Sequence, residues 1–297
     1  MSEVPAIDRV LIAGAGGMLG TALQRALSGR NVAFDAPPER EFDITDADGV
    51  ARVVRAFADA LAPGRRGLLV NAAAYTNVEA AEDNAETAYC VNEDGARILA
   101  TAACDAGLAF VHVSTDFVFD GTKDGAYVET DEPNPLSVYG ASKLAGERAV
   151  ETAYPEALIV RTAWVFGPGG ANFPRKILDL AATRDELSVV TDEVGSPTYT
   201  IDLARGILDL ADAGARGVFH LAGTGSCSRF ELAQEVLRLA GLETRVLPTT
   251  SSAFPTKAAR PANSVLDCSK ATASGVHMRQ WRESLLEFIA ELKQERD

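Results

Sequence analysis

Short apolar runs alternate with longer amphipathic segments through the first two thirds of the chain. The runs contain few polar positions and no strict in/out alternation, which is typical of strands covered on both faces. We expect strands at Val10–Ala13, Asn31–Asp35, Leu68–Asn71, Ala109–Ser114, Leu158–Thr162, Leu187–Thr191 and Val218–Ala222. Helical segments lie between them, so the pattern predicts an α/β protein of the Rossmann type with a doubly wound parallel sheet.

Glycine and proline residues mark the ends of the predicted helices. We expect helices at Met18–Ser28, Asp46–Leu61 and Ala85–Ala106, and one that begins near Ser137 and ends before Pro155. After residue 166, glycine, proline, serine and threonine become frequent. The pattern therefore predicts a domain over residues 1–165, whose sheet is joined by strands near 187–191 and 218–222, and a smaller C-terminal lobe over 166–297.

The first predicted strand leads directly into a glycine-rich turn and then a helix. Its glycines, Gly14, Gly17 and Gly20, allow a tight turn, close approach to a pyrophosphate and close helix–sheet packing. The spacing is G-x-x-G-x-x-G, and a purely structural turn is the plain alternative. As a cofactor site, the turn would bind the dinucleotide together with the helix start at Met18 and Leu19. We therefore expect residues 1–165 to form a dinucleotide-binding domain and residues 166–297 to form mainly a substrate-binding lobe.

An acid ends the second strand, where a ribose-hydroxyl acceptor belongs in such folds. This residue, Asp35, lies 21 positions after Gly14, and an ordinary strand-end acid is the alternative interpretation. A carboxylate there favours NADH over NADPH, but nearby Arg40 keeps both cofactors open. We expect the adenine and the middle of the dinucleotide to contact Asp43, Ile44, Ala73, Ala74 and Tyr75.

A hydroxyl, a phenol and an ammonium supply the groups that carbonyl reduction needs. Tyr139 and Lys143 are spaced i, i+4 on one helix face, and Thr115 ends the fourth strand. A ketone that accepts hydride needs a proton donor, and Tyr139 fits that role. An unperturbed phenol has a pKa of about 10, which a nearby Lys143 ammonium lowers. A solvated helix pair is the alternative.

Seven stretches of the chain resemble the extended short-chain dehydrogenase/reductases, and within them the reductases of dTDP-linked 4-keto sugars. These stretches are Gly14–Gly20, Asn71–Thr76, Ser114–Gly121, Tyr139–Glu147, Arg161–Phe166, Val194–Tyr199 and Arg260–Ser264. The resemblance implies that Thr115, Tyr139 and Lys143 are catalytic. It implies a substrate site formed by Thr76, Thr115, Asp116, Trp164 and Arg260.

The implied reaction is NAD(P)H-dependent reduction of dTDP-4-dehydro-6-deoxy-L-mannose to dTDP-L-rhamnose. Family members that dimerise through magnesium carry a glutamate where this chain has Ala22, so we expect no magnesium bridge and leave monomer and homodimer open. A sugar-nucleotide dehydratase is disfavoured, because Phe117 follows Asp116 where that enzyme needs an acid. Another 4-ketoreductase, a 4-epimerase and a non-catalytic, cofactor-binding regulatory subunit remain open.

The charge balance limits the partners. The chain has 28 Lys and Arg against 42 Asp and Glu, a net charge of −14, which disfavours nucleic acid and anionic membranes. Residues 245–282 carry six basic side chains against only Asp267, so we expect a basic patch there for a second diphosphate. Four scattered cysteines and the absence of a signal-like start predict a cytoplasmic protein without metal. His112 and His220 lie in apolar strands, where core imidazoles are expected.

Overall fold

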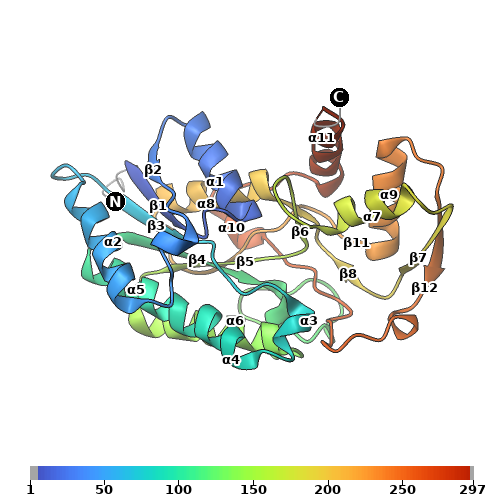
Figure 1. Ribbon diagram of the computed structural model, residues 1–297, viewed down its shortest axis with the longest axis horizontal. Helices are drawn as coiled ribbons and strands as arrows, with labels where there is room; N and C mark the ends of the chain where they lie inside the picture. The colour runs from blue at the N-terminus through green and yellow to red at the C-terminus, as the bar shows by residue number, and fades with distance from the viewer. Residues whose placement is uncertain (1–5, 295–297) are drawn as a thin grey trace.

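A six-stranded parallel sheet forms the centre of the protein, and the computed structural model describes residues 6–294 (Figure 1). The strand order is β10-β5-β4-β3-β1-β2. The strands span Arg9–Ala13 (β1), Ala33–Asp35 (β2), Gly67–Asn71 (β3), Ala109–Thr115 (β4), Leu158–Thr162 (β5) and Gly217–His220 (β10). The order reverses between β1 and β3, as in doubly wound sheets, so the predicted fold class is confirmed.

Helices cover both faces of this sheet. One apolar cluster packs α1 (Met18–Gly29), α8 (Thr200–Asp212) and α11 (Trp281–Gln294) on one face. A second cluster packs α2 (Ala47–Asp59) and α5 (Ala96–Asp105) on the other face, where α6 (Val138–Ala153) also lies (Figure 1). Every residue of β3 and β5 is buried, which explains the unbroken apolar runs in the sequence.

The strand predicted at 187–191 does not join the central sheet, so that expectation is wrong. It forms β7 (Glu186–Val190), which pairs in parallel with β12 (Arg245–Thr249) in a separate two-stranded sheet. Alternate residues of β7 are exposed, unlike those of the central strands. The strand predicted near 218–222 does join the sheet, as β10 beside β5.

The helix predicted at 85–106 consists of three parts. It begins as α4 (Ala85–Tyr89), widens into a π-helical turn, η2 (Cys90–Gly95), and continues as α5. A π-turn inserts an extra residue into the helix and re-aims its side chains, which is common at functional sites. Here it turns Asn92 inward, where this side chain is 1 % exposed.

The C-terminal segments form a smaller group of elements at the right of Figure 1. That group contains α7 (Phe173–Ala181), α9 (Arg229–Ala240), β7, β12 and the antiparallel pair of β8 (Val194–Gly195) and β11 (Cys227–Ser228). The remaining short elements are η1 (Glu39–Glu41), α3 (Val78–Ala81), η3 (Asp116–Val118), β6 (Val165–Phe166), β9 (Thr198–Tyr199), η4 (Ser251–Ala253) and α10 (Ser269–Ala273). The division of the chain at residue 165 stays a prediction.

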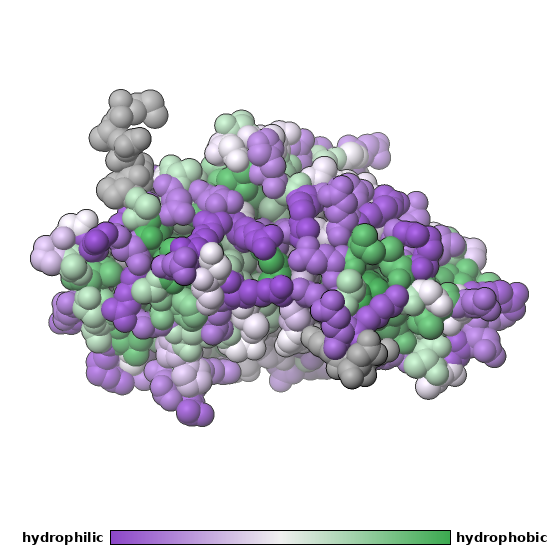
Figure 2. Space-filling model, turned by 90° about the horizontal axis from the view of Figure 1, so that it is seen from above, coloured by the Kyte–Doolittle hydropathy of each residue, from purple (hydrophilic) through white to green (hydrophobic). Residues whose placement is uncertain are grey.

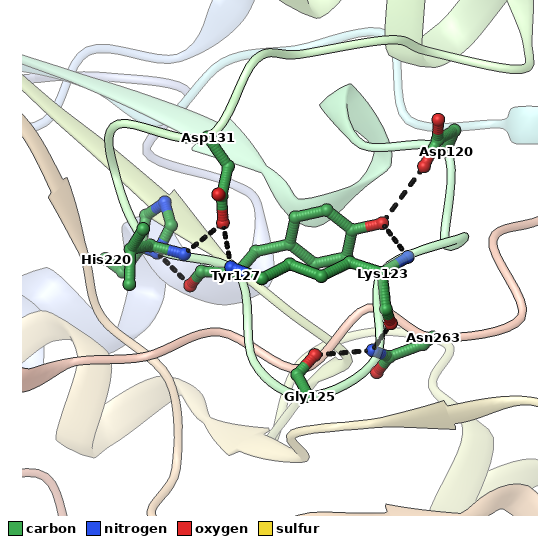
Figure 3. Close-up of polar contacts among 8 residues, drawn as sticks. Asp120, Lys123, Gly125, Tyr127, Asp131, His220 and Asn263 are labelled. Atoms are coloured by element: carbon green, nitrogen blue, oxygen red, sulfur yellow. Dashed lines mark hydrogen bonds and ion pairs between the residues drawn. The ribbon is translucent and has the colours of Figure 1, made fainter.

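The loop between η3 and α6 is tied to the C-terminal part of the chain (Figure 3). Tyr127 donates its hydroxyl to Asp120 (3.0 Å), and its carbonyl lies 3.1 Å from the His220 ring nitrogen Nδ1. Asn263 donates to the carbonyls of Lys123 (2.8 Å) and Gly125 (2.6 Å). The contacts of Asn263 fix the segment around it beside this loop.

Hydrophilic side chains cover most of the face seen in Figure 2, with smaller apolar areas between them. Among residues 6–294, no helix combines the length and apolarity needed to cross a bilayer. The described cysteines, Cys90, Cys104, Cys227 and Cys268, are all free thiols.

Candidate active site

The glycine turn between β1 and α1 is packed too closely for side chains at two of its positions. Gly14 has φ +78°, and a Cβ there would lie 2.5 Å from the backbone nitrogen of Ala73. A Cβ on Gly20 would lie 2.2 Å from the carbonyl oxygen of Gly14. Gly17 precedes the first turn of α1, which carries no acidic residue and no side-chain cap. The helix N-terminus is therefore available to an anion.

The loop after β3 lies against this turn. Asn71 accepts a hydrogen bond from the Ala73 nitrogen (3.1 Å), and Asn92 accepts one from the Tyr75 nitrogen (2.8 Å). Asn92 also donates to Ser142 on α6 (2.9 Å). The structure thus brings residues 73–75 beside the glycine turn, with Ala74 between the two anchored positions. Sequence reasoning missed Asn92, because a π-turn leaves no signal in apolar periodicity.

The predicted adenine-side residues have different surroundings. Asp35 ends β2 and forms an ion pair with Arg9 (2.9 Å), a partner that the sequence did not reveal. Asp43 is exposed and accepts hydrogen bonds from the nitrogen (2.9 Å) and hydroxyl (2.7 Å) of Thr45. Ile44 is buried in the core. Asp35 and Asp43 therefore keep carboxylates at this edge, whereas the Ile44 side chain packs inward.

The proposed reducing groups converge at the carboxyl end of β4. Thr115 ends this strand, and α6 begins at Val138 after an N-cap in which Ser137 accepts from the Gly140 nitrogen (3.2 Å). A Cβ on Gly140 would lie 2.2 Å from the Phe117 carbonyl, so this glycine lets α6 approach η3. The Phe117 ring packs edge-on against the Tyr139 ring, with centroids 5.5 Å apart. Phe117, which stands where a dehydratase needs an acid, thus packs against the Tyr139 phenol.

The phenol and the ammonium are shifted in opposite directions by burial. Burial raises the pKa of Tyr139 to about 12, the Thr115 hydroxyl lowers it and the Asp116 charge raises it. Burial lowers the pKa of Lys143 to about 8, and Glu147 raises it. Lys143 Nζ donates to the Val113 carbonyl (2.7 Å). Burial outweighs the other influences on Tyr139, so its phenol is protonated at neutral pH.

Asp116 and Trp164 lie beside this centre, as the sequence predicts. Asp116 is 2 % exposed, and burial raises the pKa of its carboxyl to about 6. Trp164 adopts φ +46° and donates its indole N–H to Ser264 (3.1 Å). The Arg229 guanidinium carbon lies 3.4 Å from the centre of a Trp164 ring. Arg229 also forms an ion pair with Glu193 (3.6 Å) and is a site residue that sequence reasoning missed.

The expected basic patch over residues 245–282 is not a group of free cations, so this interpretation is wrong. Arg260 forms an ion pair with Glu79 of α3 (2.6 Å), next to exposed Thr76. Lys257 pairs with Asp83. Arg245 pairs with Glu186, and Arg279 pairs with Asp202 and Glu287. Lys270 donates to the Val218 carbonyl, and Arg282 lies over the Trp281 ring. Tertiary pairing with acids from elsewhere in the chain neutralises most of the local charge.

The two strand histidines are core imidazoles, as predicted. His112 is 1 % exposed and His220 is fully buried. Burial lowers the pKa of both rings, that of His220 to about 4. Among residues 6–294, no cluster of three or more His, Cys, Asp or Glu side chains has the geometry of a metal site. At the position discussed for magnesium, Ala22 is buried in the core between α1 and the sheet.

Together, the fold and the site define a Rossmann-type α/β protein with the Thr, Tyr and Lys arrangement of a carbonyl reductase. The chain belongs to the family described as the RmlD substrate binding domain, whose sequence pattern matches residues 8–294. This membership confirms the resemblance noted from the motifs.

Three relatives illustrate the similarity. A dTDP-4-dehydrorhamnose reductase of Mycobacterium tuberculosis is 43 % identical over 293 residues, covering 95 % of this chain and 93 % of the relative. A dTDP-4-keto-6-deoxy-D-glucose reductase of Streptomyces niveus is 39 % identical, covering 94 % and 95 %. The crystal structure of dTDP-4-dehydrorhamnose reductase from Bacillus anthracis in complex with NADP is 37 % identical, with a TM-score of 0.90 and coverage of 96 % and 99 %.

Proposed function

We propose that the protein is an NAD(P)H-dependent reductase that converts dTDP-4-dehydro-6-deoxy-L-mannose to dTDP-L-rhamnose. The observation that carries the proposal is the convergence of Thr115, Tyr139 and Lys143 at the carboxyl end of β4. Relatives named as reductases of this substrate support it, as does the NADP complex of one of them. The protein would supply these residues to the site, and the cofactor would supply the hydride.

The residues of the glycine turn fit a dinucleotide. The space that a Cβ would fill at Gly14 and Gly20 is taken by backbone, and the first turn of α1 offers amide groups without an acid nearby. Gly17, Met18 and Leu19 complete this cradle. The pyrophosphate would be held there, while residues 73–75 line the middle of the cofactor and Asp35, Asp43 and Ile44 lie toward the adenosine.

Asp35 and Arg9 favour different cofactors. The carboxylate accepts from a free ribose hydroxyl, and the guanidinium binds a 2′-phosphate, so NADH and NADPH both fit. The NADP complex of the Bacillus anthracis relative supports NADPH.

The chemical role of each side chain follows from its protonation state. Tyr139 holds its proton, because burial raises its pKa to about 12, and gives it to the carbonyl oxygen as hydride reaches carbon 4. Lys143 stabilises the phenolate that remains on Tyr139, and Thr115 hydrogen-bonds the carbonyl oxygen of the substrate. The sugar nucleotide would contact Thr76, Asp116, Trp164 and Arg260. The Arg260 guanidinium would then bind both Glu79 and the sugar nucleotide.

The experiment is a comparison of the wild-type protein with Tyr139→Phe. We expect loss of NADPH absorbance at 340 nm with dTDP-4-dehydro-6-deoxy-L-mannose, and a fall in kcat of about 10²–10⁴ in the variant with cofactor affinity unchanged. The control is Tyr154→Phe at the C-cap of α6, whose hydroxyl donates to the Leu108 carbonyl (2.9 Å) at the opposite end of that helix from Tyr139. No absorbance loss in the wild type with any 4-keto sugar would contradict the proposal.

An alternative sugar has one specific observation in its favour. The Streptomyces niveus relative is named for a 4-keto-6-deoxy-D-glucose substrate, and its identity of 39 % lies between those of the other two relatives. Product analysis by NMR separates the two sugars. We further propose a cytoplasmic enzyme, supported by the four free thiols, that works as a monomer or homodimer.

A further inference from the structure

A row of buried polar contacts joins β4 to α6 beneath the Tyr139 side chain. Lys143, one helical turn after Tyr139, donates its ammonium to the Val113 carbonyl (2.7 Å). Glu147, a further turn along, accepts from the Ser114 hydroxyl (2.5 Å). Successive residues of the strand therefore hold helix residues spaced four apart, and this sets the position of α6 against β4.

The Glu147 carboxylate is held by a second strand as well. Arg161 of β5 donates through Nε to both carboxylate oxygens (2.9 and 3.2 Å) and through Nη2 to Oε2 (2.6 Å). The two side chains are only 5 % and 3 % exposed. Arg161 is the register partner of Ser114 in the sheet, so both donors approach the carboxylate from neighbouring strands.

Stability alone does not account for this pair. Burying two charges costs several kcal/mol per ion, and replacing such a pair by apolar residues is often neutral or stabilising. The nitrogen Nη1 of Arg161 has no hydrogen-bond partner among the described residues, and its guanidinium lies 5.2 Å from the centre of the Phe119 ring. Because Glu147 lies one helical turn after Lys143 and raises its pKa, an incompletely satisfied buried pair at this position points to an electrostatic task.

The buried groups around Lys143 contain two cations and one carboxylate. Arg161 and Lys143 are the cations, and Glu147 is the anion. His112 of β4 faces Lys143, and His220 of β10 faces Arg161; burial lowers the pKa of both rings, so both are neutral at pH 7. The other charged or titratable groups nearby are Tyr139 and, beyond it, Asp116, while η2 contributes the neutral Asn92. Among Lys143, Arg161 and Glu147, one positive charge is left for the phenolate, since the charge of the Asp116 carboxylate is balanced by Arg229.

We propose that Glu147 and Arg161 are positioning residues that set the charge of Lys143: Arg161 holds the Glu147 carboxylate at Ser114, which keeps the Lys143 ammonium on the Val113 carbonyl and free to stabilise the Tyr139 phenolate. This inference rests on the proposed reductase function. It predicts that the two residues act in opposite directions on the same ionisation, although both are buried and both stabilise the same helix position.

The signs follow from the charges. Glu147→Gln removes the carboxylate that raises the pKa of Lys143, so the ionisation of Lys143, which would limit activity at high pH, moves to lower pH. Arg161→Met leaves a carboxylate without its partner, so that ionisation moves to higher pH. Each shift is about one pH unit or more, since a neighbouring unit charge in a buried site changes a pKa by that amount. The double variant restores the wild-type position.

The test measures kcat against pH for the wild type, both single variants, the double variant and Glu235→Gln as a control. Glu235 forms a comparable Arg pair on the surface of α9, and we expect its variant to keep the wild-type profile. Opposite shifts of the alkaline limb support the proposal. Shifts in the same direction, or no shift in folded variants, overturn it, because a purely structural role gives lower kcat without opposite shifts.

Two further measurements keep the test decisive. If Arg161→Met does not fold, Ser114→Ala is a smaller change that loosens the Glu147 carboxylate. We expect Ser114→Ala to shift the alkaline limb in the direction expected for Arg161→Met. Carbon-13 NMR of the Lys143 side chain, resolved among six lysines by a Lys143→Met spectrum, reports the same ionisation without turnover. Failure of the wild type to reduce any 4-keto sugar would refute the proposed function, while opposite shifts of this NMR titration would still support the charge relation.

Discussion

Replacing Gly20 by alanine tests the packing of the glycine turn most severely. The new Cβ would lie 2.2 Å from the Gly14 carbonyl oxygen and 2.7 Å from the Ala15 Cα. Both contacts are with backbone, and ordinary van der Waals contact begins near 3.4 Å. The turn must therefore move by about an ångström. Overpacking of this kind costs roughly 1–3 kcal/mol.

This cost has two expected effects. For a chain of this size, we expect the midpoint of thermal unfolding to fall by roughly 2–5 °C. The affinity for NADPH falls by about tenfold or more, because the displaced turn no longer presents the amide groups of α1 to the pyrophosphate. Thermal unfolding by circular dichroism and a fluorescence titration with NADPH measure the two effects.

A matched substitution lies at the other end of the same helix. A methyl group on Gly29 would meet no heavy atom within 4 Å, so Gly29→Ala should keep both the unfolding midpoint and the NADPH affinity. If Gly20→Ala unfolds at the wild-type temperature and binds NADPH as tightly as Gly29→Ala does, the close-packed turn is not the cofactor cradle.

Three further predictions concern the residues around the turn and the substrate. Asp35→Asn removes the carboxylate from the ribose position and should shift the NADPH over NADH ratio of kcat/KM by about tenfold toward NADPH; an unchanged ratio contradicts that placement. Arg229→Met removes the cation over Trp164, worth about 1–2 kcal/mol when desolvated, and should raise KM for the sugar nucleotide about 5- to 30-fold with little change in kcat; a fall in kcat at constant KM opposes this role. Burial raises the pKa of Asp116 in the folded protein from 3.8 to about 6. The native state therefore loses roughly 3 kcal/mol of stability as the pH rises from 4 through 6. Urea unfolding at pH 4 and pH 7 measures this loss, which Asp116→Asn should lack.

The sequence predicts the central sheet well because burial on both faces leaves a clear record. Central strands such as β3 and β5 are buried at every position, and their runs are apolar throughout. Apolar content alone places the separate strand β7 in the same sheet, yet alternate residues of β7 are exposed. Alternation within a short run is the signal that distinguishes it.

The candidate site divides in the same way. Gly14, Thr115 and Tyr139 are recognisable because local chemistry demands those residue types at those positions. The pairing of Arg260 with Glu79 joins residues 181 positions apart, and the stacking of Arg229 on Trp164 likewise depends on tertiary structure. Local charge counts cannot reveal such partners, so the sequence predicts a basic patch where paired cations occur.

We propose above all that this chain directs hydride to carbon 4 of a dTDP-linked 4-keto-6-deoxy sugar. The most direct measurement uses NADPH deuterated at the transferable position of the nicotinamide, followed by NMR of the purified product. We expect deuterium at carbon 4 of the product sugar, delivered to one face only, and an L-rhamnose configuration of that sugar. Product without deuterium, or with deuterium at carbon 3 or carbon 5, would contradict the account.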